Sequence, residues 1–143
     1  MQIMAIKGEI AWPARKVWSV VSDFGGLKQW NPAVVTCDLR GSGVGAERVF
    51  ATKAATVVER IDSFDDAGMK IGYSIVSGST IPVAHGALTI SVRPIDANLC
   101  EVTWTLDGEP QGVSAGELRA QVEKRYLGRL DDLRHFLASA QSK

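Results

Sequence analysis

The C-terminal part of the sequence carries apolar residues at the spacing of one helix face. They recur every three or four positions, which is typical of a long amphipathic helix that packs against another layer. The residues of this face are Leu118, Val122, Tyr126, Leu130, Leu133 and Leu137. Because such a helix needs a large surface to cover it, it restricts how the rest of the chain can be arranged.

Two features within this segment refine the prediction. "SAGE", Ser114 to Glu117, is a capping box, in which the serine and glutamate side chains satisfy free amides at a helix start. Gly128 lies in the middle of the predicted helix and costs about 1 kcal/mol relative to alanine. We expect a close approach of a sheet at Gly128 to compensate this cost.

Strand-like segments fill most of the remaining chain. Residues 2–12 alternate apolar and polar positions, and six further segments have strand character. These six are residues 34–40, 47–52, 56–64, 69–77, 85–94 and 99–108. The connections are short and rich in turn residues, so the sequence predicts seven strands with antiparallel neighbours.

Two short helices are predicted after the first strand. Pro13 suits the first position of a helix, which Gly25 and Gly26 end. The apolar face of this helix comprises Val17, Val20, Val21 and Phe24. "LKQWNP", residues 27–32, predicts one further helical turn that Pro32 ends.

The order of elements predicts the architecture. An antiparallel sheet with one polar face must curl its apolar face around a partner, and the terminal helix is the only long one predicted. We therefore expect an α+β fold in which a seven-stranded curled sheet surrounds a long C-terminal helix. With 143 residues the chain suits a single domain spanning residues 1–143.

Charge and composition restrict the function. Lys plus Arg and Asp plus Glu each number 16, and no block of like charge occurs, which argues against binding to nucleic acid or to anionic membranes. The sequence begins without the features of a signal peptide and contains no long apolar run, so we expect a cytoplasmic protein without integral membrane association. Cys37 and Cys100 are predicted to be buried thiols. No metal or cofactor motif occurs, since "GSGVG" precedes a strand and is typical of a turn.

Four segments carry a resemblance to a known family. They are "PARKVWSVVSDFGGLKQWNPAV", "GVGAERVF", "VVERIDSFDDAGMKIGYSIVSG" and the terminal helix, and together they cover almost the whole chain. In order and spacing the sequence resembles the helix-grip superfamily called SRPBCC or START-like, and within it the polyketide cyclase/dehydrase-like group. The resemblance implies a deep cavity between sheet and terminal helix that binds lipids, hormones, polyketides or other apolar molecules.

The resemblance also bears on the tryptophans and on signalling. It implies that Trp30 lies near the cavity mouth and Trp18 in the supporting core, although both can equally be plain core residues. Plant abscisic-acid receptors look like distant relatives. Only "TKAAT" stands where those receptors have their gate loop, so hormone-receptor signalling is not implied.

Glu59 is the most informative candidate site residue. It shares strand parity with Val57 and Ile61, which predicts a carboxylate on the inner, apolar face. A short hairpin around "KAA" brings Arg48 within one cross-strand or diagonal step of Glu59. The pair is either a satisfied buried ion pair or a polar anchor at the cavity floor that orients a ligand. Related proteins place a ligand-contacting acid at this strand position.

Two further residues are candidates for polar contacts. Tyr73 shares parity with Met69 and Ile71, so its phenol is predicted to point inward. The periodicity of its strand points His85 outward, but a bulge at Gly86 would turn it inward, as the family resemblance favours. We expect His85 in the cavity and the other histidine, His135, at the surface.

Three functions are compatible with these residues. The first is binding of a small hydrophobic or amphipathic molecule, such as a lipid, by a monomer or homodimer without a cofactor or metal. The second is a polyketide cyclase or dehydratase that uses Glu59 or His85 as acid/base, with Tyr73 or Arg48 stabilising an enolate. An Arg48 pair would keep Glu59 charged and weakly basic, which favours binding. The third is an interaction protein with a filled core. The predicted lining of the cavity is Trp30, Arg48, Phe50, Glu59, Ile61, Tyr73, Ile75, His85, Val122 and Tyr126.

Overall fold

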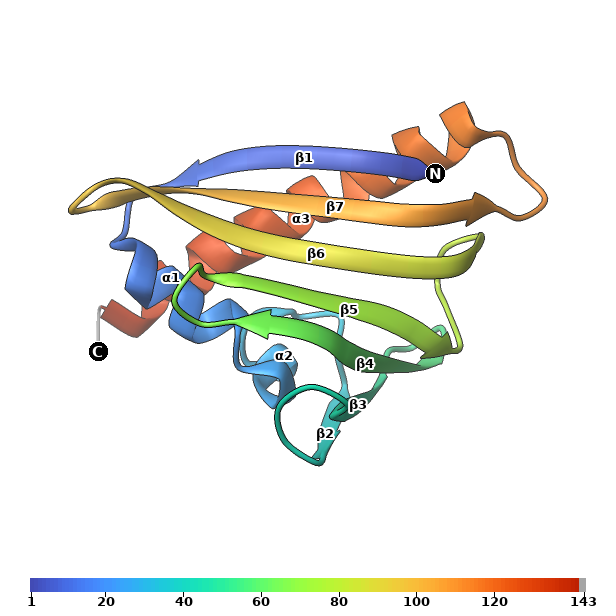
Figure 1. The fold of residues 1–143 in the computed structure, drawn as a ribbon, viewed down its shortest axis with the longest axis horizontal. Coiled ribbons are helices and arrows are strands. Elements are labelled where there is room, and N and C mark those ends of the chain that lie inside the picture. The colour runs from blue at the N-terminus through green and yellow to red at the C-terminus, as the bar shows by residue number, and fades with distance from the viewer. Residues whose placement is uncertain (142–143) are drawn as a thin grey trace.

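The computed structural model describes residues 1–141 and contains the predicted seven-stranded sheet (Figure 1). The strands are β1 (Gln2–Ile10), β2 (Thr36–Arg40), β3 (Glu47–Ala51), β4 (Thr56–Asp65), β5 (Lys70–Ser77), β6 (Val83–Asp96) and β7 (Leu99–Pro110). The helices are α1 (Ala14–Val21), the single 3₁₀ turn η1 (Phe24–Gly26), α2 (Leu27–Trp30) and α3 (Ala115–Gln141). All neighbouring strands are antiparallel, in the order β1-β7-β6-β5-β4-β3-β2. The predicted α+β helix-grip architecture is confirmed.

Helix α3 crosses the sheet diagonally, behind it in Figure 1, and packs mainly against β1 and β7. The predicted apolar face makes this contact. Leu118, Val122, Leu130, Leu133 and Leu137 are fully buried, and only Tyr126 is partly exposed. Burial of these side chains is the main stabilisation of a helix of this length.

The start of α3 has the serine half of the predicted capping box, while the Glu117 side chain bonds the Ser114 hydroxyl in place of a backbone amide. The amide of Glu117 donates to Ser114 Oγ at 3.1 Å, which satisfies one free amide of the first turn. The Glu117 carboxylate accepts from the Ser114 hydroxyl at 3.1 Å. The serine hydroxyl therefore both accepts and donates at this cap.

The prediction for Gly128 is wrong. A Cβ placed on Gly128 would meet no atom within 4 Å, so no strand lies close to it. Gly128 instead borders the cavity described below. The missing side chain therefore leaves open space at this position of α3.

The segment formed by η1 and α2 packs against β2. Gly25 lies against β2, where a Cβ would come within 2.9 Å of Leu39 Cβ. Such contacts are essentially never seen for real side chains, so glycine permits the close approach. The α2 helix ends at Trp30, and Asn31 is already extended, as the following Pro32 requires.

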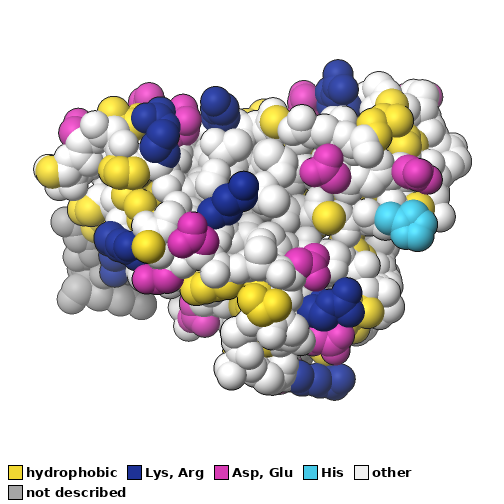
Figure 2. Space-filling view, in the orientation of Figure 1, with side chains coloured by type: hydrophobic (Ala, Val, Ile, Leu, Met, Phe, Trp, Pro, Cys, Tyr) yellow, Lys and Arg dark blue, Asp and Glu magenta, His cyan; other side chains and the backbone are white. Residues whose placement is uncertain are grey.

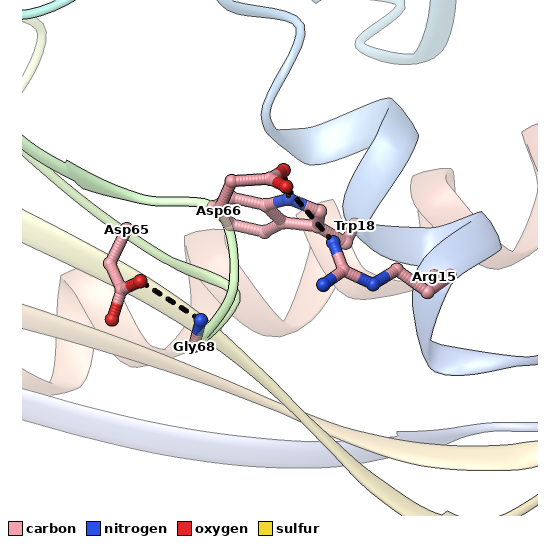
Figure 3. Close-up of polar contacts among 5 residues, drawn as sticks. All are labelled: Arg15, Trp18, Asp65, Asp66 and Gly68. Atoms are coloured by element: carbon pink, nitrogen blue, oxygen red, sulfur yellow. Dashed lines mark hydrogen bonds and ion pairs between the residues drawn. The ribbon is translucent and has the colours of Figure 1, made fainter.

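A second set of contacts fixes α1 to the β4–β5 hairpin (Figure 3). Trp18 Nε1 donates to Asp66 Oδ1 at 2.8 Å, and Arg15 forms an exposed ion pair with Asp66 at 3.4 Å. The hairpin itself is closed by the Gly68 amide, which donates to Asp65 Oδ1 at 2.9 Å. Trp18 is buried and does not line the cavity, as predicted for a supporting core residue.

The face of the molecule seen in Figure 2 carries charged side chains of both signs, with hydrophobic side chains scattered between them. No helix of residues 1–141 is long and apolar enough to span a membrane. The candidate site described below lies on the other side of the sheet, between its inner face and the helices α2 and α3.

Candidate functional site

A cavity of about 980 Å³ lies between the inner face of the sheet, α2 and α3. Its volume is at the upper end of the range for small-molecule sites. Apolar and aromatic residues from α1 to β7 form its floor: Val21, Phe24, Leu27, Trp30, Phe50, Ile71, Tyr73, Ile90 and Trp104. Helix α3 forms one wall with Gln121, Lys124, Arg125, Tyr126, Gly128, Arg129 and Asp132. This open space leaves the filled-core alternative without support.

An ion pair lies on the floor. Arg48 and Glu59 are direct cross-strand partners on β3 and β4, as the short hairpin predicts. Arg48 Nε donates to Glu59 Oε1 at 2.9 Å, and Arg48 Nη2 lies 2.7 Å from the same oxygen as an ion-pair contact. Each residue is only 6% exposed, and they are the buried charged residues of the described chain. A pair buried this deeply is costly to break, since the remaining charge would lack compensation.

Aromatic rings surround the guanidinium of Arg48. Its Cζ lies 3.9 Å from the ring centroid of Phe24, 5.1 Å from Tyr73 and 5.8 Å from Phe50. All three distances are within the range of cation–π attraction. Arg48 Nη1 also donates to the carbonyl oxygen of Phe24 at 3.2 Å. Burial opposes the charge of Arg48, but Glu59 and the other neighbours outweigh it, so the pKa of Arg48 is raised.

Tyr73 points inward, as its strand parity predicts. Its hydroxyl oxygen accepts a long hydrogen bond from Trp104 Nε1 at 3.4 Å. Burial, with a smaller contribution from the charge of Glu59, raises the pKa of Tyr73 to about 12. The phenol is therefore protonated near neutral pH, and its O–H can be donated to a ligand oxygen.

Aromatic residues from three elements connect the floor with the helix wall. The ring centroids of Trp30 and Trp104 are 6.0 Å apart, and those of Trp104 and Tyr126 are 5.6 Å apart. Burial raises the pKa of Tyr126 well above its usual value. These residues offer large apolar surfaces with few polar atoms, which suits a hydrophobic ligand.

Six of the ten predicted lining residues border the cavity: Trp30, Arg48, Phe50, Glu59, Tyr73 and Tyr126. Ile61 and Val122 are buried in the core and do not reach it. Ile75 packs against the core beside Gly86, where a Cβ would come within 2.9 Å of Ile75 Cδ1. These three residues face inward, but neighbouring side chains cover them.

The expectation that His85 faces the cavity is wrong. The bulge in β6 exists, since the register against β7 shifts between Ala84 and Ala87. Within it His85 has a left-handed backbone conformation with φ of 55° and an exposed side chain, whereas Gly86 is buried. Gly86 thus faces inward with Leu88 and Ile90, and His85 faces outward as the periodicity of the strand predicts; the bulge does not reverse it. His135 is exposed, as predicted.

Several lining residues were not predicted. Trp104 shares strand parity with the buried Val102 and Leu106, so the alternation of β7 contains the signal for it. Phe24 was assigned to a helix face, although its ring lies on Arg48. The polar residues of α3 carry no such signal, because a polar helix stripe facing a cavity has the same pattern as one facing solvent.

The two cysteines differ in their accessibility. Cys100 is buried, but Cys37 is only half-buried, so one of the two predicted buried thiols is partly accessible. Burial raises the pKa of both thiols, and Arg48 opposes this rise at Cys37. Within residues 1–141 no group of three or more His, Cys, Asp or Glu side chains could hold a metal ion.

Comparison with known families gives one clear match. The sequence model of the family described as polyketide cyclase/dehydrase and lipid transport matches residues 1–137. The match therefore spans every strand and nearly all of α3.

Solved structures show the same fold. A protein from Bacillus thuringiensis is 29% identical and superimposes with a TM-score of 0.83, covering 93% of this chain and 97% of that one. A START superfamily protein from Mycobacterium smegmatis is 18% identical, with a TM-score of 0.78 and coverages of 95% and 97%. The Zhui aromatase/cyclase from a Streptomyces species is 22% identical, with a TM-score of 0.74 and coverages of 96% and 92%. At 18% and 22% identity, the last two structures show a similar fold only.

Proposed function

The chain belongs to the polyketide cyclase/dehydrase and lipid transport family, and we propose that it binds a small hydrophobic or amphipathic molecule between the curled sheet and α3. The observation that carries the proposal is the cavity of about 980 Å³ with its aromatic floor. An apolar pocket with a few convergent polar groups is the usual form of a small-molecule site. Arg48, Glu59 and Tyr73 are those polar groups here.

In this proposal the ion pair orients the ligand. The guanidinium of Arg48 donates to hydroxyl or carbonyl oxygens, and the Tyr73 phenol supplies a second donor. Because Glu59 and three aromatic rings hold Arg48 in place, little side-chain entropy remains to be lost on binding. Phe50, Trp30 and Trp104 then contact the apolar part of the ligand.

A cyclase or dehydratase activity is the second candidate, and the aromatase/cyclase of similar fold favours it. With His85 at the outer surface, Glu59 is the acid/base candidate that borders the cavity, and Tyr73 would donate to an enolate. The Glu59 oxygen that would have to take a proton from a ligand, Oε1, already accepts a hydrogen bond from Arg48. Binding without turnover is therefore the better supported function.

Titration with N-phenyl-1-naphthylamine, a neutral apolar probe, tests the proposal. Trp30 and Trp104 line the cavity, so bound probe is expected to quench tryptophan fluorescence and to become fluorescent itself. Filling the open space beside α3 with Gly128→Trp should reduce both signals, whereas Gly116→Trp, outside the cavity on the same helix, should leave them unchanged. Equal binding by both variants, or no binding by the native chain, would contradict the proposal.

A substitution at Glu59 separates binding from catalysis. Glu59→Gln is expected to weaken probe affinity modestly if the pair only positions a ligand. If Glu59 acts as the catalytic acid or base, the same change should abolish the formation of product from a poly-β-ketone. Mass spectrometry measures the product. Glu101→Gln is the matched control, since Glu101 pairs with Arg93 away from the cavity.

A further inference from the structure

The charges that line the cavity are strongly unequal. Five basic side chains and two acidic ones border it: Arg48, Lys53, Lys124, Arg125 and Arg129, against Glu59 and Asp132. The whole sequence is balanced at 16 of each sign, so the remainder of the chain holds eleven basic and fourteen acidic residues. Positive charge is therefore concentrated at the cavity, although the chain has no net charge.

Both acidic residues are already paired. Glu59 accepts from Arg48, and Asp132 Oδ2 lies 2.5 Å from Arg129 Nη1 on the same helix. Lys53, Lys124 and Arg125 have no carboxylate within ion-pair distance in the part of the chain that the structure describes. These three residues, the rim cations below, provide the unbalanced charge.

The rim cations come from two sides of the opening. Lys53 lies in the β3–β4 turn, and Lys124 and Arg125 lie on α3. Hydrogen bonds to the Thr80 side chain and backbone carbonyl hold Arg125 at the β5–β6 connection. Both lysines are exposed and Arg125 is half-buried, so an ion can reach all three from solvent.

The opposite end of the cavity differs in chemistry. The floor is formed by aliphatic and aromatic residues around the Arg48–Glu59 pair, whose charges compensate one another. A molecule that fits both ends must combine an apolar body with a group that complements positive charge. An apolar molecule without a charged end would leave the rim cations unused, and a cationic end would be repelled.

We propose that the ligand is an anionic amphiphile, whose carboxylate or phosphate lies among Lys53, Lys124 and Arg125 while its apolar body lies on the aromatic floor. This inference names the ligand class of the proposed site and rests on the proposed function. The positive charge of the rim cations raises the affinity for an anionic ligand. Because these side chains are accessible to solvent, added salt should weaken this contribution. Arg125 adds directed hydrogen bonds because Thr80 fixes it.

A series of probes with one tail and different head groups tests the inference. Dodecanoate, dodecyl phosphate, 1-dodecanol and dodecyltrimethylammonium are titrated below their micelle concentrations, with tryptophan fluorescence as readout. The two anions are expected to bind about tenfold more tightly than the alcohol at low salt, and to lose this advantage as salt rises. The cation should bind more weakly than the alcohol. The relative affinity of the two anions shows whether a carboxylate or a phosphate fits better.

Matched lysine variants locate the effect. Lys124→Gln and Lys53→Gln should each weaken dodecanoate binding about two- to fivefold and leave 1-dodecanol binding unchanged. Lys70→Gln, an exposed lysine on β5 outside the cavity, should change neither. An equal loss in Lys70→Gln would overturn the inference, because the effect would then be one of general charge.

The outcomes also separate the inference from the proposed function. Equal binding of the acid and the alcohol would overturn the anionic ligand class and keep the apolar site. If none of the four probes nor the neutral naphthylamine binds, the proposed function fails, and the ligand class fails with it.

Discussion

The two halves of the sheet are built from the same antiparallel ladder but are packed differently. In the half formed by β1, β7 and β6, alternate residues are buried, including Cys100, Val102, Trp104 and Leu106 of β7. The leucines of α3 cover this half. In the other half β2 has no buried residue, and the buried residue of β3 is the charged Arg48.

The difference shows how one sheet can be both stable and hollow. Where the leucines of α3 meet β1 and β7, apolar burial holds the fold together. At β3 and β4 the helix presents polar residues and Gly128 instead, and space remains between the layers. The Arg48–Glu59 ion pair then links β3 and β4 at the edge of this space, beside the buried Val57 and Ile61. Substitutions in the packed half and in the open half are therefore expected to differ in their effect on stability.

Arg48→Met should lower the free energy of unfolding by about 3 to 5 kcal/mol, because Glu59 would remain buried without its partner. Urea unfolding measures the change. The double variant Arg48→Met/Glu59→Leu should recover most of the loss, since it removes both charges. Arg93→Met, which breaks a pair with an exposed arginine, should cost less than about 1 kcal/mol. Equal losses in the two single variants would show that the cavity pair is as solvated as a surface pair.

Replacing a leucine by alanine in each half of the sheet compares how much apolar contact contributes to stability there. Leu133→Ala, at a fully buried position of α3, should cost about 3 to 5 kcal/mol. Leu27→Ala, on the cavity floor, should cost about 2 kcal/mol, because it enlarges a space that already exists. Chemical denaturation of both variants checks the ranking, and a larger loss at Leu27 would mean that the open half carries more of the core than the structure indicates.

Alkaline pH tests the burial of the phenol at the cavity floor. The pKa of Tyr73 is about 12 in the fold against 10.0 ordinarily, so the folded state holds this proton more tightly. The stabilisation is complete below pH 10 and is lost as pH rises towards 12, by about 2 to 3 kcal/mol.

Tyr73→Phe should show a shallower loss of unfolding free energy over the same pH interval. The near-ultraviolet absorbance of tyrosinate gives an independent readout. Since the pKa values of both tyrosines of the chain are raised, neither should ionise at the pH of a free tyrosine. A tyrosine that titrates normally in the folded protein would contradict this assignment of burial.

Gly128→Ala should stabilise the protein by about 1 kcal/mol, because the added methyl group meets no atom and favours the helix. Gly116→Ala, in the first turn of α3 and also without neighbours, should give a similar or smaller gain. Thermal unfolding measures both. A loss of stability at Gly128 would mean that the space beside it is smaller than the structure shows.

The elements could be predicted because their signals are local. The capping box at Ser114 and the alternation of strand residues depend on near neighbours in sequence. The Arg48–Glu59 contact was also predictable, although the residues lie on different strands, since the short turn between them fixes the register. Strand parity also places Arg48, Phe50, Glu59 and Tyr73 on the face of the sheet that lines the cavity.

The remaining errors concern features that the pattern does not determine. A polar stripe containing Lys124 and Arg129 has the same spacing whether it faces solvent or a hollow. The sequence also does not show whether a glycine in a helix faces a strand or open space, so a close strand was wrongly expected at Gly128. At His85 the periodicity of the strand correctly pointed outward, and the error came from expecting the bulge at Gly86 to reverse it. All three features depend on how distant parts of the chain pack together, which the local sequence pattern does not contain.

The hydrogen bond from Arg48 to the Phe24 carbonyl has a consequence for the rate of ligand exchange. Phe24 begins the turn that leads into α2, and Trp30 at the end of α2 lines the cavity. The side chain that meets the polar part of a guest is thus bonded to the backbone leading to one wall of the chamber. Any guest that draws Arg48 away from Phe24 would loosen that wall, so departure and wall opening become coupled events, visible as faster deuterium uptake in residues 25–31.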